Sequence, residues 1–438
     1  MGKHFPFIII LVVVLLARLG VFLYYQPWSS RYDLRMVGED PYTYHRLAMD
    51  LLVKRTYGNR EWDPQYHAAT VRPPGYPLFI AAVYALFGAK PWVVLLAQIL
   101  LEIAGCALLM VLMRGLSGAS SALIAGLLYG LHPYTVFTSI TMYSETLFLS
   151  LSVLFLYLVF AFTRTDIAVR KAVLIAVATG VLGGVLTYVR VSMLYFIPLL
   201  FLVICLTMNA AMTRRVVLVL VFAIAFTAIL TPWMLHNKSK FGSYRLSVSG
   251  EYNLLVLTVG VAFMQGSGVE EYSVTKSRLA TTAREKMQAD GLDPAEHPLE
   301  LAKYYRKTAG ELVMEEPRTV ILGVARGLLK FWLLPSRASG EPLNTRGLIG
   351  RLTFFVSLMI QIVLLTGAVY GAKLLWGPET RRWVWMFCIA SVYFSLTAGA
   401  AGSSRFFLQV LPYTVVLSGA GWSAWLSRWH RRPQESMG

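Results

Sequence analysis

The stretch from Gly38 to Leu78, GEDPYTYHRLAMDLLVKRTYGNREWDPQYHAATVRPPGYPL, is the first polar segment of the chain. It follows an apolar N-terminal run that reaches Tyr25, and most of what comes after it is strongly hydrophobic. The stretch combines an acidic pair, Glu39-Asp40, with an amphipathic helical pattern and a rigid Arg72-Pro73-Pro74 turn. Such a segment between apolar runs points to polar chemistry at a membrane surface.

The composition indicates a polytopic membrane protein. Hydrophobic residues make up 56% of the chain and charged residues only 14%, against about 25% charged in an ordinary soluble domain. Apolar runs of roughly 18 to 25 residues recur, which is the length that spans about 30 Å of hydrocarbon as a helix. The runs lack the alternation of a β-barrel, so we expect helices.

The order of the runs predicts an all-α fold with about ten transmembrane helices. We expect spans at 5–25, 91–113, 119–138, 146–162, a fifth ending near 188, 193–208, 216–233, 352–375, 383–399 and 406–426. The prediction divides the chain into an N-terminal module (1–236) with a catalytic first loop (26–90), a larger polar loop region (237–350), and C-terminal helices with a basic tail (351–438).

Both loops are expected to contain helices that do not cross the membrane. In the first loop, Tyr44, Leu47, Ala48, Leu51 and Leu52 recur with helical spacing and predict a helix lying on the membrane surface. A short apolar patch at 78–87 is expected at the interface. In the second loop, helical patterns cover about 274–290 and 298–316, and 319–334 is expected to be interfacial or re-entrant.

The distribution of cations predicts the orientation. The net charge is +17, and with ten spans the clustered Lys and Arg residues fall on one side, which the positive-inside rule assigns to the cytoplasm. The two large loops and the turns that hold Glu145, Arg190 and Arg405 then share the extracytoplasmic face. A multi-pass protein of the inner (plasma) membrane with one site on that face is therefore expected.

Asp40 and Arg72 are the strongest candidates for chemistry. Asp40 precedes Pro41, so it can be a plain helix N-cap, but a rigid, partly desolvated carboxylate can also act as a general base. The prolines after Arg72 force it into an extended conformation, and a guanidinium on a stiff support suits a phosphate. The alternative for Arg72 is an arginine that only reaches lipid headgroups.

Three further charges are candidates for binding an anionic lipid head. Glu145 begins an apolar helix, where it can interact with the helix dipole alone, although a carboxylate next to hydrocarbon favours a role. Arg190 and Arg405 stand almost alone between spans on the face opposite the cation clusters. His45, His67 and His236 show no metal-ligand spacing, so metal binding stays unknown from the residues.

The motifs resemble those of GT-C glycosyltransferases, in particular bacterial relatives of protein O-mannosyltransferases and of the lipid A aminoarabinose transferase. Asp40-x3-Tyr44-x3-Ala48-x2-Leu51 followed by Arg72-Pro73-Pro74-Gly75-Tyr76-Pro77-Leu78 is similar to their first extracytoplasmic loop. Pro232-Trp233-x2-His236-Asn237-x3-Phe241-Gly242 is a further, fairly specific match. Gly250-x-Tyr252-Asn253-Leu254 and Ser404-Arg405-Phe406 with Pro412 match more weakly. The resemblance extends to about Gly421.

The resemblance implies an inverting transferase that takes a sugar from a polyprenyl-monophosphate donor to an envelope lipid, glycan or protein. Asp40 would correspond to the catalytic aspartate and Arg72 to a basic residue near the donor phosphate. The order Glu39-Asp40-Pro41 lacks an acid after the aspartate, which leaves a divalent-metal cofactor open. The expected substrate-binding residues are Glu39, Tyr44, Arg72, Glu145, Arg190, His236, Asn237 and Arg405.

Two other functions remain open from the sequence. A membrane transporter or lipid flippase would fit the hydropathy, but the absence of detectable repeats and an expected lack of charges at mid-span stand against it. A non-catalytic scaffold would use the loop from about 237 to 344 to bind a partner protein. No nucleic-acid partner is expected, because the basic residues lie in short clusters between apolar runs.

Overall fold

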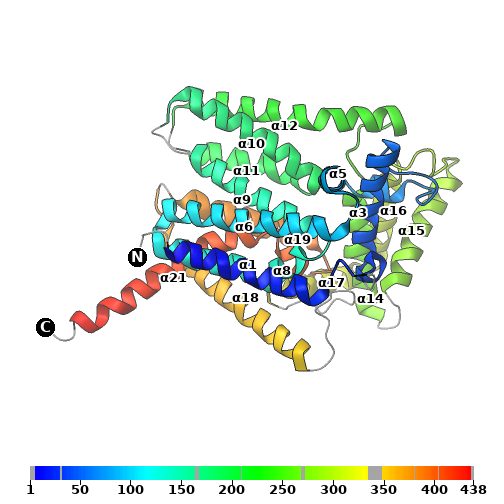
Figure 1. Cartoon of the computed structure of the whole chain (residues 1–438). Coiled ribbons are helices and arrows are strands. Elements are labelled where there is room, and N and C mark those ends of the chain that lie inside the picture. Colours follow the sequence, from blue (N-terminus) through cyan, green and yellow to red (C-terminus); the bar gives the residue numbers. More distant parts are fainter. Residues whose placement is uncertain are drawn as a thin grey trace.

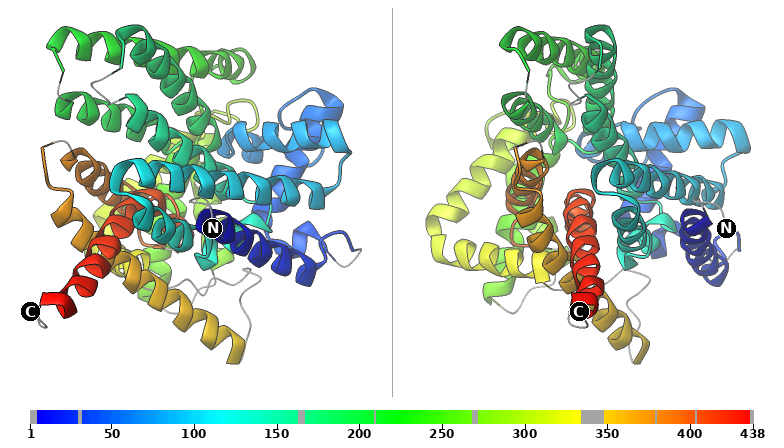
Figure 2. Two further views of the ribbon diagram at one scale, coloured as in Figure 1. Left: turned by 60° about the vertical axis from the view of Figure 1, so that its left-hand side comes forward. Right: turned by 90° about the vertical axis from the view of Figure 1, so that its left-hand side faces the viewer.

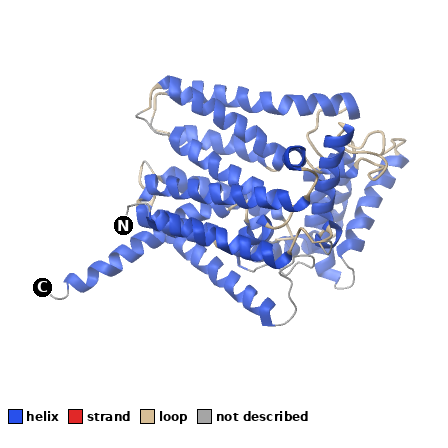
Figure 3. Cartoon of the chain, viewed as in Figure 1, coloured by secondary structure: helices blue, strands red, loops and turns tan. Residues whose placement is uncertain are grey.

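Long apolar helices dominate the computed structural model, which describes residues 5–29, 32–162, 167–208, 210–267, 272–333, 348–378, 380–402 and 404–435. These residues are helical or lie in loops, and no strand occurs among them (Figure 3). Within the described residues, six helices are long and apolar enough to cross a membrane: α1 (Phe5–Tyr25), α6 (Pro91–Ser117), α9 (Ser144–Phe162), α10 (Val169–Val189), α12 (Met212–Phe241) and α18 (Leu348–Leu374). The all-α membrane fold is therefore confirmed.

Shorter helices complete the bundle. They are α5 (Gly75–Phe87), α7 (Ala119–Gly130), α8 (Pro133–Ser139), α11 (Met193–Thr207), α19 (Arg381–Ala398), α20 (Ser404–Phe407) and α21 (Leu411–Glu435). A helix lies at every position where the sequence predicts a span, but length and composition mark only the six long ones as able to cross, so the count of ten is not confirmed. Helix α21 packs against α18, α7 and α19, and it lies near the middle of the bundle in the end-on view (Figure 2).

The predicted third span, 119–138, is instead two helices. Helix α7 ends at Gly130, and α8 begins at Pro133, with His132 in an extended conformation between them. A proline cannot continue a helix from the preceding residues, but it fits the first helical position. The chain therefore breaks at this point, and the remaining segment reaches Glu145 through the turn at 140–143 rather than through a continuous helix.

The two polar loops form a cap at one end of the bundle. The first loop contains α2 (Leu34–Val37), α3 (Glu39–Met49), the π-helical turn η1 (Asp50–Lys54) and α4 (His67–Val71); the second contains α13 (Ser249–Asn253), η2 (Leu254–Gly260), α14 (Val261–Ser267), α15 (Tyr272–Ala289), α16 (Leu301–Glu315) and α17 (Pro317–Leu333). Figure 1 shows α3, α15 and α16 at the end of the molecule opposite the two termini. The predicted helices in both loops are present, while 334–347 and 436–438 lie outside the described residues.

A second hydrophobic core holds the cap together. Side chains from η2, α15 and α16 pack around Leu255, Ala283 and Tyr305, apart from the main core of the bundle. The amide of Val248 donates to the Thr70 carbonyl at 3.0 Å, and the Ser247 hydroxyl donates to the Val71 carbonyl at 3.0 Å. The second loop is thus hydrogen-bonded to the residues immediately before Arg72.

Candidate active site

Asp40 lies in the first turn of α3, next to a glycine that shapes the approach of the chain. Gly38 is the N-cap of α3 with φ +151°, a conformation that favours glycine. A Cβ at this position would lie 3.3 Å from the Tyr143 hydroxyl, so the start of α3 comes close to the turn before Glu145. Helix α3 already begins at Glu39 with Gly38 as its N-cap, so the alternative role of Asp40 as the N-cap is not what the structure shows.

Arg72 is held in the extended conformation that the following proline predicts. It caps the C-terminus of α4 with φ −90° and ψ 122°, away from the helical region that a following proline disfavours. Its carbonyl accepts a hydrogen bond from the Tyr57 hydroxyl at 2.8 Å. Its guanidinium carbon lies 5.6 Å from the centre of the Tyr44 ring, so an aromatic face supports the cation.

The carboxylate of Asp40 is bound by two arginines that come from distant parts of the chain. Arg72 Nη2 pairs with Asp40 Oδ1, and Arg405 Nη2 donates to Asp40 Oδ2 at 2.7 Å. Arg405 lies in α20, between α19 and α21, 365 positions after Asp40. Each carboxylate oxygen therefore has its own guanidinium.

Glu145 joins the same cluster from the first turn of α9. Its side chain is fully buried, at 0% exposure, and pairs with Arg190 Nη1 at 3.0 Å and with Arg405 through Nε and, at 3.3 Å, Nη2. Arg405 also stacks on the Tyr143 ring, with its guanidinium carbon 4.1 Å from the ring centre. The structure thus brings together five predicted residues, which we call the arginine cluster: Asp40, Arg72, Glu145, Arg190 and Arg405.

The charge balance of the arginine cluster favours an anion. Three guanidiniums against two carboxylates leave one net positive charge. The side chains of Arg72 and Arg405 are 24% and 28% exposed, whereas Glu145 is sealed off. An incoming anion can therefore reach both of the arginines that hold Asp40, while the buried Glu145 pairs with Arg190 and Arg405.

The arginines also determine the protonation of Asp40. Burial by itself raises the pKa of this carboxyl, but the guanidiniums of Arg72 and Arg405 and the ammonium of Lys276 more than offset that effect. The pKa of Asp40 is therefore held well below its usual range, and the group is a carboxylate at neutral pH. In this arrangement it is a hydrogen-bond acceptor that is already occupied by two guanidiniums.

The neighbouring acid, Glu39, is directed to a different partner. It pairs with Lys276 from α15, so the Glu39-Asp40 pair splits between the two loops. Nothing in the sequence around Lys276 signals this contact, because the partner of Glu39 depends on where the second loop places Lys276 relative to the first loop. Tyr143 was also missed, although it lies two residues before Glu145 in MYSET and could have been found from that proximity.

His236 and Asn237 lie in α12 and make contacts elsewhere. His236 is exposed and stacks on the Trp233 ring with 4.8 Å between ring centres. The Asn237 amide donates to the carbonyls of Arg245 at 2.7 Å and Leu246 at 3.4 Å. The hydrogen bonds of Asn237 hold the α12–α13 loop, and a substrate role for either residue stays a prediction.

Metal ligation is not supported by any cluster of donor side chains in the described residues. No group of three His, Cys, Asp or Glu side chains there lies close enough together to hold an ion. His45 Nδ1 lies 2.8 Å from the Tyr84 hydroxyl. Burial, with the nearby cations of Arg284, Arg72 and Lys276, lowers the pKa of His67 to about 3, so this imidazole is neutral. Metal dependence stays open.

Comparison with known proteins agrees with this architecture. Residues 71–235 match the model of the dolichyl-phosphate-mannose-protein mannosyltransferase family. The chain is similar to the archaeal oligosaccharyltransferase AglB from Archaeoglobus fulgidus in complex with an inhibitory peptide and a dolichol-phosphate, with a TM-score of 0.60 and 16% identity over 100% of this chain and 52% of that one. The apo form of the A. fulgidus enzyme gives 0.59 and 14%, with the same coverage.

A weaker match is the crystal structure of ArnT from Cupriavidus metallidurans in the apo state, with a TM-score of 0.42, 16% identity and coverage of 88% of this chain and 73% of that one. A search of curated proteins gives no match. The chain spans about half the length of the oligosaccharyltransferase chains that it resembles. The molecule is therefore an integral membrane protein with the GT-C fold, and the predicted resemblance to GT-C glycosyltransferases is confirmed.

Proposed function

We propose that this protein is an inverting glycosyltransferase that uses a sugar linked to a polyprenyl monophosphate. The observation that carries the proposal is the arginine cluster, in which Asp40 lies between two partly exposed guanidiniums. A glycosyl phosphodiester has one negative charge, which matches the single net positive charge of the cluster. The AglB neighbour, which binds a dolichol-phosphate, supports a lipid-linked phosphate as the donor type.

The reaction needs a base and a site for the leaving phosphate. Asp40 would take the proton from the acceptor hydroxyl, and the acceptor oxygen would then attack the anomeric carbon from the face opposite the phosphate. The bond between the anomeric carbon and the phosphate oxygen breaks, and the electron pair leaves on the polyprenyl phosphate. Arg72 and Arg405 would stabilise the charge that grows on the leaving oxygen, which is typically a large catalytic effect.

The ion pairs of Asp40 would make donor binding precede activation of the base. Without a donor, both carboxylate oxygens are bound to guanidiniums and the pKa of the group is low, so Asp40 is a weak base. A phosphate that takes over Arg72 and Arg405 would release the carboxylate and raise its pKa. The base would then become effective only after the donor has bound, which would limit wasteful hydrolysis.

The acceptor and the location are proposed more coarsely. We expect an envelope lipid, glycan or protein as acceptor, and we expect the arginine cluster to face the extracytoplasmic side of the inner membrane. The cap, with the helix α3 that carries Asp40, lies at the end of the bundle opposite the termini (Figure 1), which is the arrangement expected if the basic clusters near the termini are cytoplasmic.

The proposal is tested by reconstitution. The purified protein in proteoliposomes is supplied with a series of polyprenyl-monophosphate-linked sugars and an extract of envelope acceptors, and transfer is measured by mass spectrometry. Envelope glycolipids and glycoproteins from cells with and without the gene identify the sugar that is lost. We expect one sugar to be transferred with release of polyprenyl monophosphate; no transfer from any monophosphate donor, with no sugar missing from the mutant cells, would refute the proposal.

A further inference from the structure

A buried polar side chain in the membrane bundle connects two parts of the arginine cluster without belonging to it. Gln98 lies on α6, a membrane-spanning helix, and its side chain is inaccessible to solvent. Burying an amide in an apolar region is costly unless it is hydrogen-bonded. Here the amide has partners on both of its atoms, and they come from two different elements.

One arm leads from Gln98 to Arg72. The Tyr76 hydroxyl, on α5, donates to Gln98 Oε1. The Tyr76 ring packs edge-on against the Tyr44 ring with 4.8 Å between centres, and Tyr44 is the ring that lies under the Arg72 guanidinium. Tyr76 also follows Arg72 by only four residues through the rigid Pro73-Pro74 turn. Gln98 is thus connected to Arg72 in two ways, through the ring contacts of Tyr76 and Tyr44 and through the short chain between Arg72 and Tyr76.

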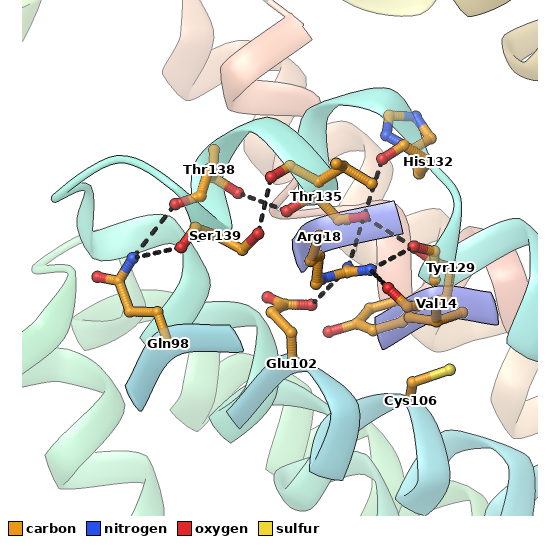
Figure 4. Close-up of polar contacts among 12 residues, drawn as sticks. Val14, Arg18, Gln98, Glu102, Cys106, Tyr129, His132, Thr135, Thr138 and Ser139 are labelled. Carbon is orange, nitrogen blue, oxygen red and sulfur yellow. Dashed lines mark hydrogen bonds and ion pairs between the residues drawn. The ribbon is translucent and has the colours of Figure 1, made fainter. Parts of the chain in front are cut away.

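The other arm leads to the turn before Glu145. Gln98 Nε2 donates to the carbonyls of Thr138 and Ser139 at 3.3 Å each and to the Thr141 carbonyl at 2.8 Å (Figure 4 shows the first two). The Thr141 carbonyl also accepts from the Tyr143 amide at 2.8 Å. Tyr143 supports the Arg405 guanidinium, so this arm ends at the second arginine that holds Asp40.

A second set of contacts holds the beginning of the same segment. It involves two buried charges inside predicted spans, Arg18 and Glu102, so the expected lack of charges at mid-span is wrong. Arg18 donates to the Gly130 carbonyl at 2.7 Å and to the Thr135 hydroxyl at 3.2 Å, and its Nη2 lies 3.5 Å from Glu102 Oε2 (Figure 4). Glu102 lies four residues after Gln98 on α6, which places both on one face of the helix. The interrupted segment 130–141 is therefore fixed to α6 at both ends.

We propose that Gln98 is a positioning residue, which sets the distance between Arg72 and Arg405 by joining α5 to the carbonyls that precede Glu145. The inference rests on the proposed function, because it concerns the geometry of that same site. Gln98 is separated from Asp40 by Tyr76 and Tyr44 on one arm and by the 138–143 segment on the other, so it acts through them. Small displacements of a reacting group can cost about 100-fold in rate.

The test compares Gln98→Met with Tyr76→Phe in the full-length protein. Gln98→Met keeps the length of the side chain and removes both arms, whereas Tyr76→Phe removes only the bond to α5. We expect kcat to fall by about 10- to 100-fold for Gln98→Met and by less for Tyr76→Phe, with the donor KM changed less than threefold. The double variant should be no slower than Gln98→Met alone, because both changes break one linkage.

The matched control is Gln361→Met. Gln361 is another buried glutamine, and its amide donates to the Trp332 carbonyl at 3.0 Å between α18 and α17. Its replacement has the same chemistry without touching either arm. We expect its kcat to stay within about twofold of the wild type, which separates the loss of a buried amide from the loss of this linkage.

Hydrogen exchange supplies a readout that does not depend on transfer. Amides between Thr138 and Glu145 should exchange faster in Gln98→Met and stay unchanged in Gln361→Met. Wild-type kcat per folded molecule in both Gln98→Met and Tyr76→Phe, even with a lower melting temperature, would overturn the inference and leave the proposed function intact. A wild-type protein that transfers nothing refutes the proposed function instead, and exchange still tests the linkage. If Gln98→Met does not fold, the kcat of Tyr76→Phe tests the inference: a reduced kcat supports it, and a wild-type kcat overturns it.

Discussion

Each oxygen of the Asp40 carboxylate is bound to a different arginine. A substitution at Asp40 can therefore have different effects on base catalysis and on binding of the donor phosphate. Asp40→Asn keeps the shape of the side chain but removes the base. Loss of a general base typically lowers turnover by about 10²- to 10⁴-fold. We expect that loss in a transfer assay, with normal membrane insertion and with polyprenyl-phosphate affinity equal to or higher than that of the wild type.

Glu61→Gln serves as the control for Asp40→Asn. Glu61 is a carboxylate in the same loop, 73% exposed and paired with Lys54, and an exposed pair of this kind contributes little. Turnover of Glu61→Gln should equal that of the wild type. Wild-type turnover in Asp40→Asn would remove Asp40 from the mechanism.

Arg72 makes two contacts that a lysine at this position could not make together. Its guanidinium pairs with Asp40 while its flat face lies over Tyr44, and an ammonium cannot reproduce both contacts. Arg72→Ala should raise the donor KM by about 10- to 100-fold, since a hydrogen bond to a charged group contributes about 1.5–3 kcal/mol. Arg72→Lys should recover only part of this loss, and an unchanged donor KM in Arg72→Ala would contradict the phosphate role.

The pH dependence follows from the lowered pKa of Asp40. Its carboxylate stabilises the fold at every pH above the ordinary Asp value of about 3.9, and that contribution is lost only as the pH falls through the lower folded value. The profile of kcat/KM, which reports the free enzyme, should therefore have no acid limb from Asp40 above about pH 5.

In the donor complex the phosphate draws the guanidiniums away from Asp40, so the acid limb of kcat should lie at higher pH than that of kcat/KM. Steady-state rates between pH 4 and 8 measure both profiles. His67, with a pKa of about 3, adds no titration in this range. An acid limb of kcat/KM near pH 6 would mean that another group is the base.

At the scale of the elements, α5 and α10 are in contact close to Arg72, which precedes α5, and Arg190, which follows α10. A Cβ on Gly75 would lie 2.6 Å from the Tyr188 carbonyl carbon and 2.7 Å from its oxygen, so only glycine permits this approach. Gly75 follows the turn of Arg72, and Tyr188 precedes Arg190 by two residues. Gly75→Ala should push α5 from α10, lowering both the melting temperature and kcat.

Gly310→Ala provides the contrast for the change at Gly75. Gly310 lies inside α16, and a Cβ at this position would meet no other atom within 4 Å. Alanine in a helix interior is favoured over glycine by about 0.5–1 kcal/mol. We expect an equal or higher melting temperature and wild-type turnover; equal effects of both substitutions would argue against the close approach of α5 and α10.

Helix positions were largely predictable, and their partners were not. Hydropathy runs located the helices at 91–113 or 193–208 to within a few residues, because each depends on its own composition. The break between α7 and α8 was missed, although Pro133 could have signalled it. The pairing of Glu39 with Lys276 joins the two polar loops, and no local pattern encodes how those loops lie relative to each other.

The convergence of Arg190, Glu145 and Arg405 was nevertheless predictable from charge. Each stands nearly alone between apolar runs on the side without cation clusters, and the structure joins all three. The role of Gln98 was not predicted, because a single glutamine in an apolar run carries no signal in the composition. Its importance appears only once Tyr76 and the 138–141 carbonyls are placed around it.

At the scale of the whole molecule, binding of the carrier lipid should increase the stability of the folded protein. A ligand that binds only the folded state stabilises it by about 2.7 kcal/mol at 100 times its Kd. Polyprenyl monophosphate should therefore raise the melting temperature of the purified protein, and Arg72→Ala should reduce the shift. A neutral polyprenol of the same length is the control, because it tests the tail without the phosphate.

The rival function, a transporter or flippase, makes a different prediction for the intact protein. Proteoliposomes loaded with labelled donor lipid should release sugar to the acceptor without moving intact lipid between leaflets. Lipid movement without consumption of the sugar–phosphate bond, unaffected by Asp40→Asn, would favour the transporter. Sugar release that depends on Asp40 would favour the transferase.

The pair between Asp40 and Arg405 also has a consequence for biogenesis. The two residues are 365 positions apart, so a ribosome adding about 5–20 residues per second needs roughly 20 to 70 seconds to make the second after the first. During that time the nascent chain contains Asp40 and Arg72 but not yet Arg405. If the protein acts as proposed, its site would be complete only when nearly the whole chain has been made.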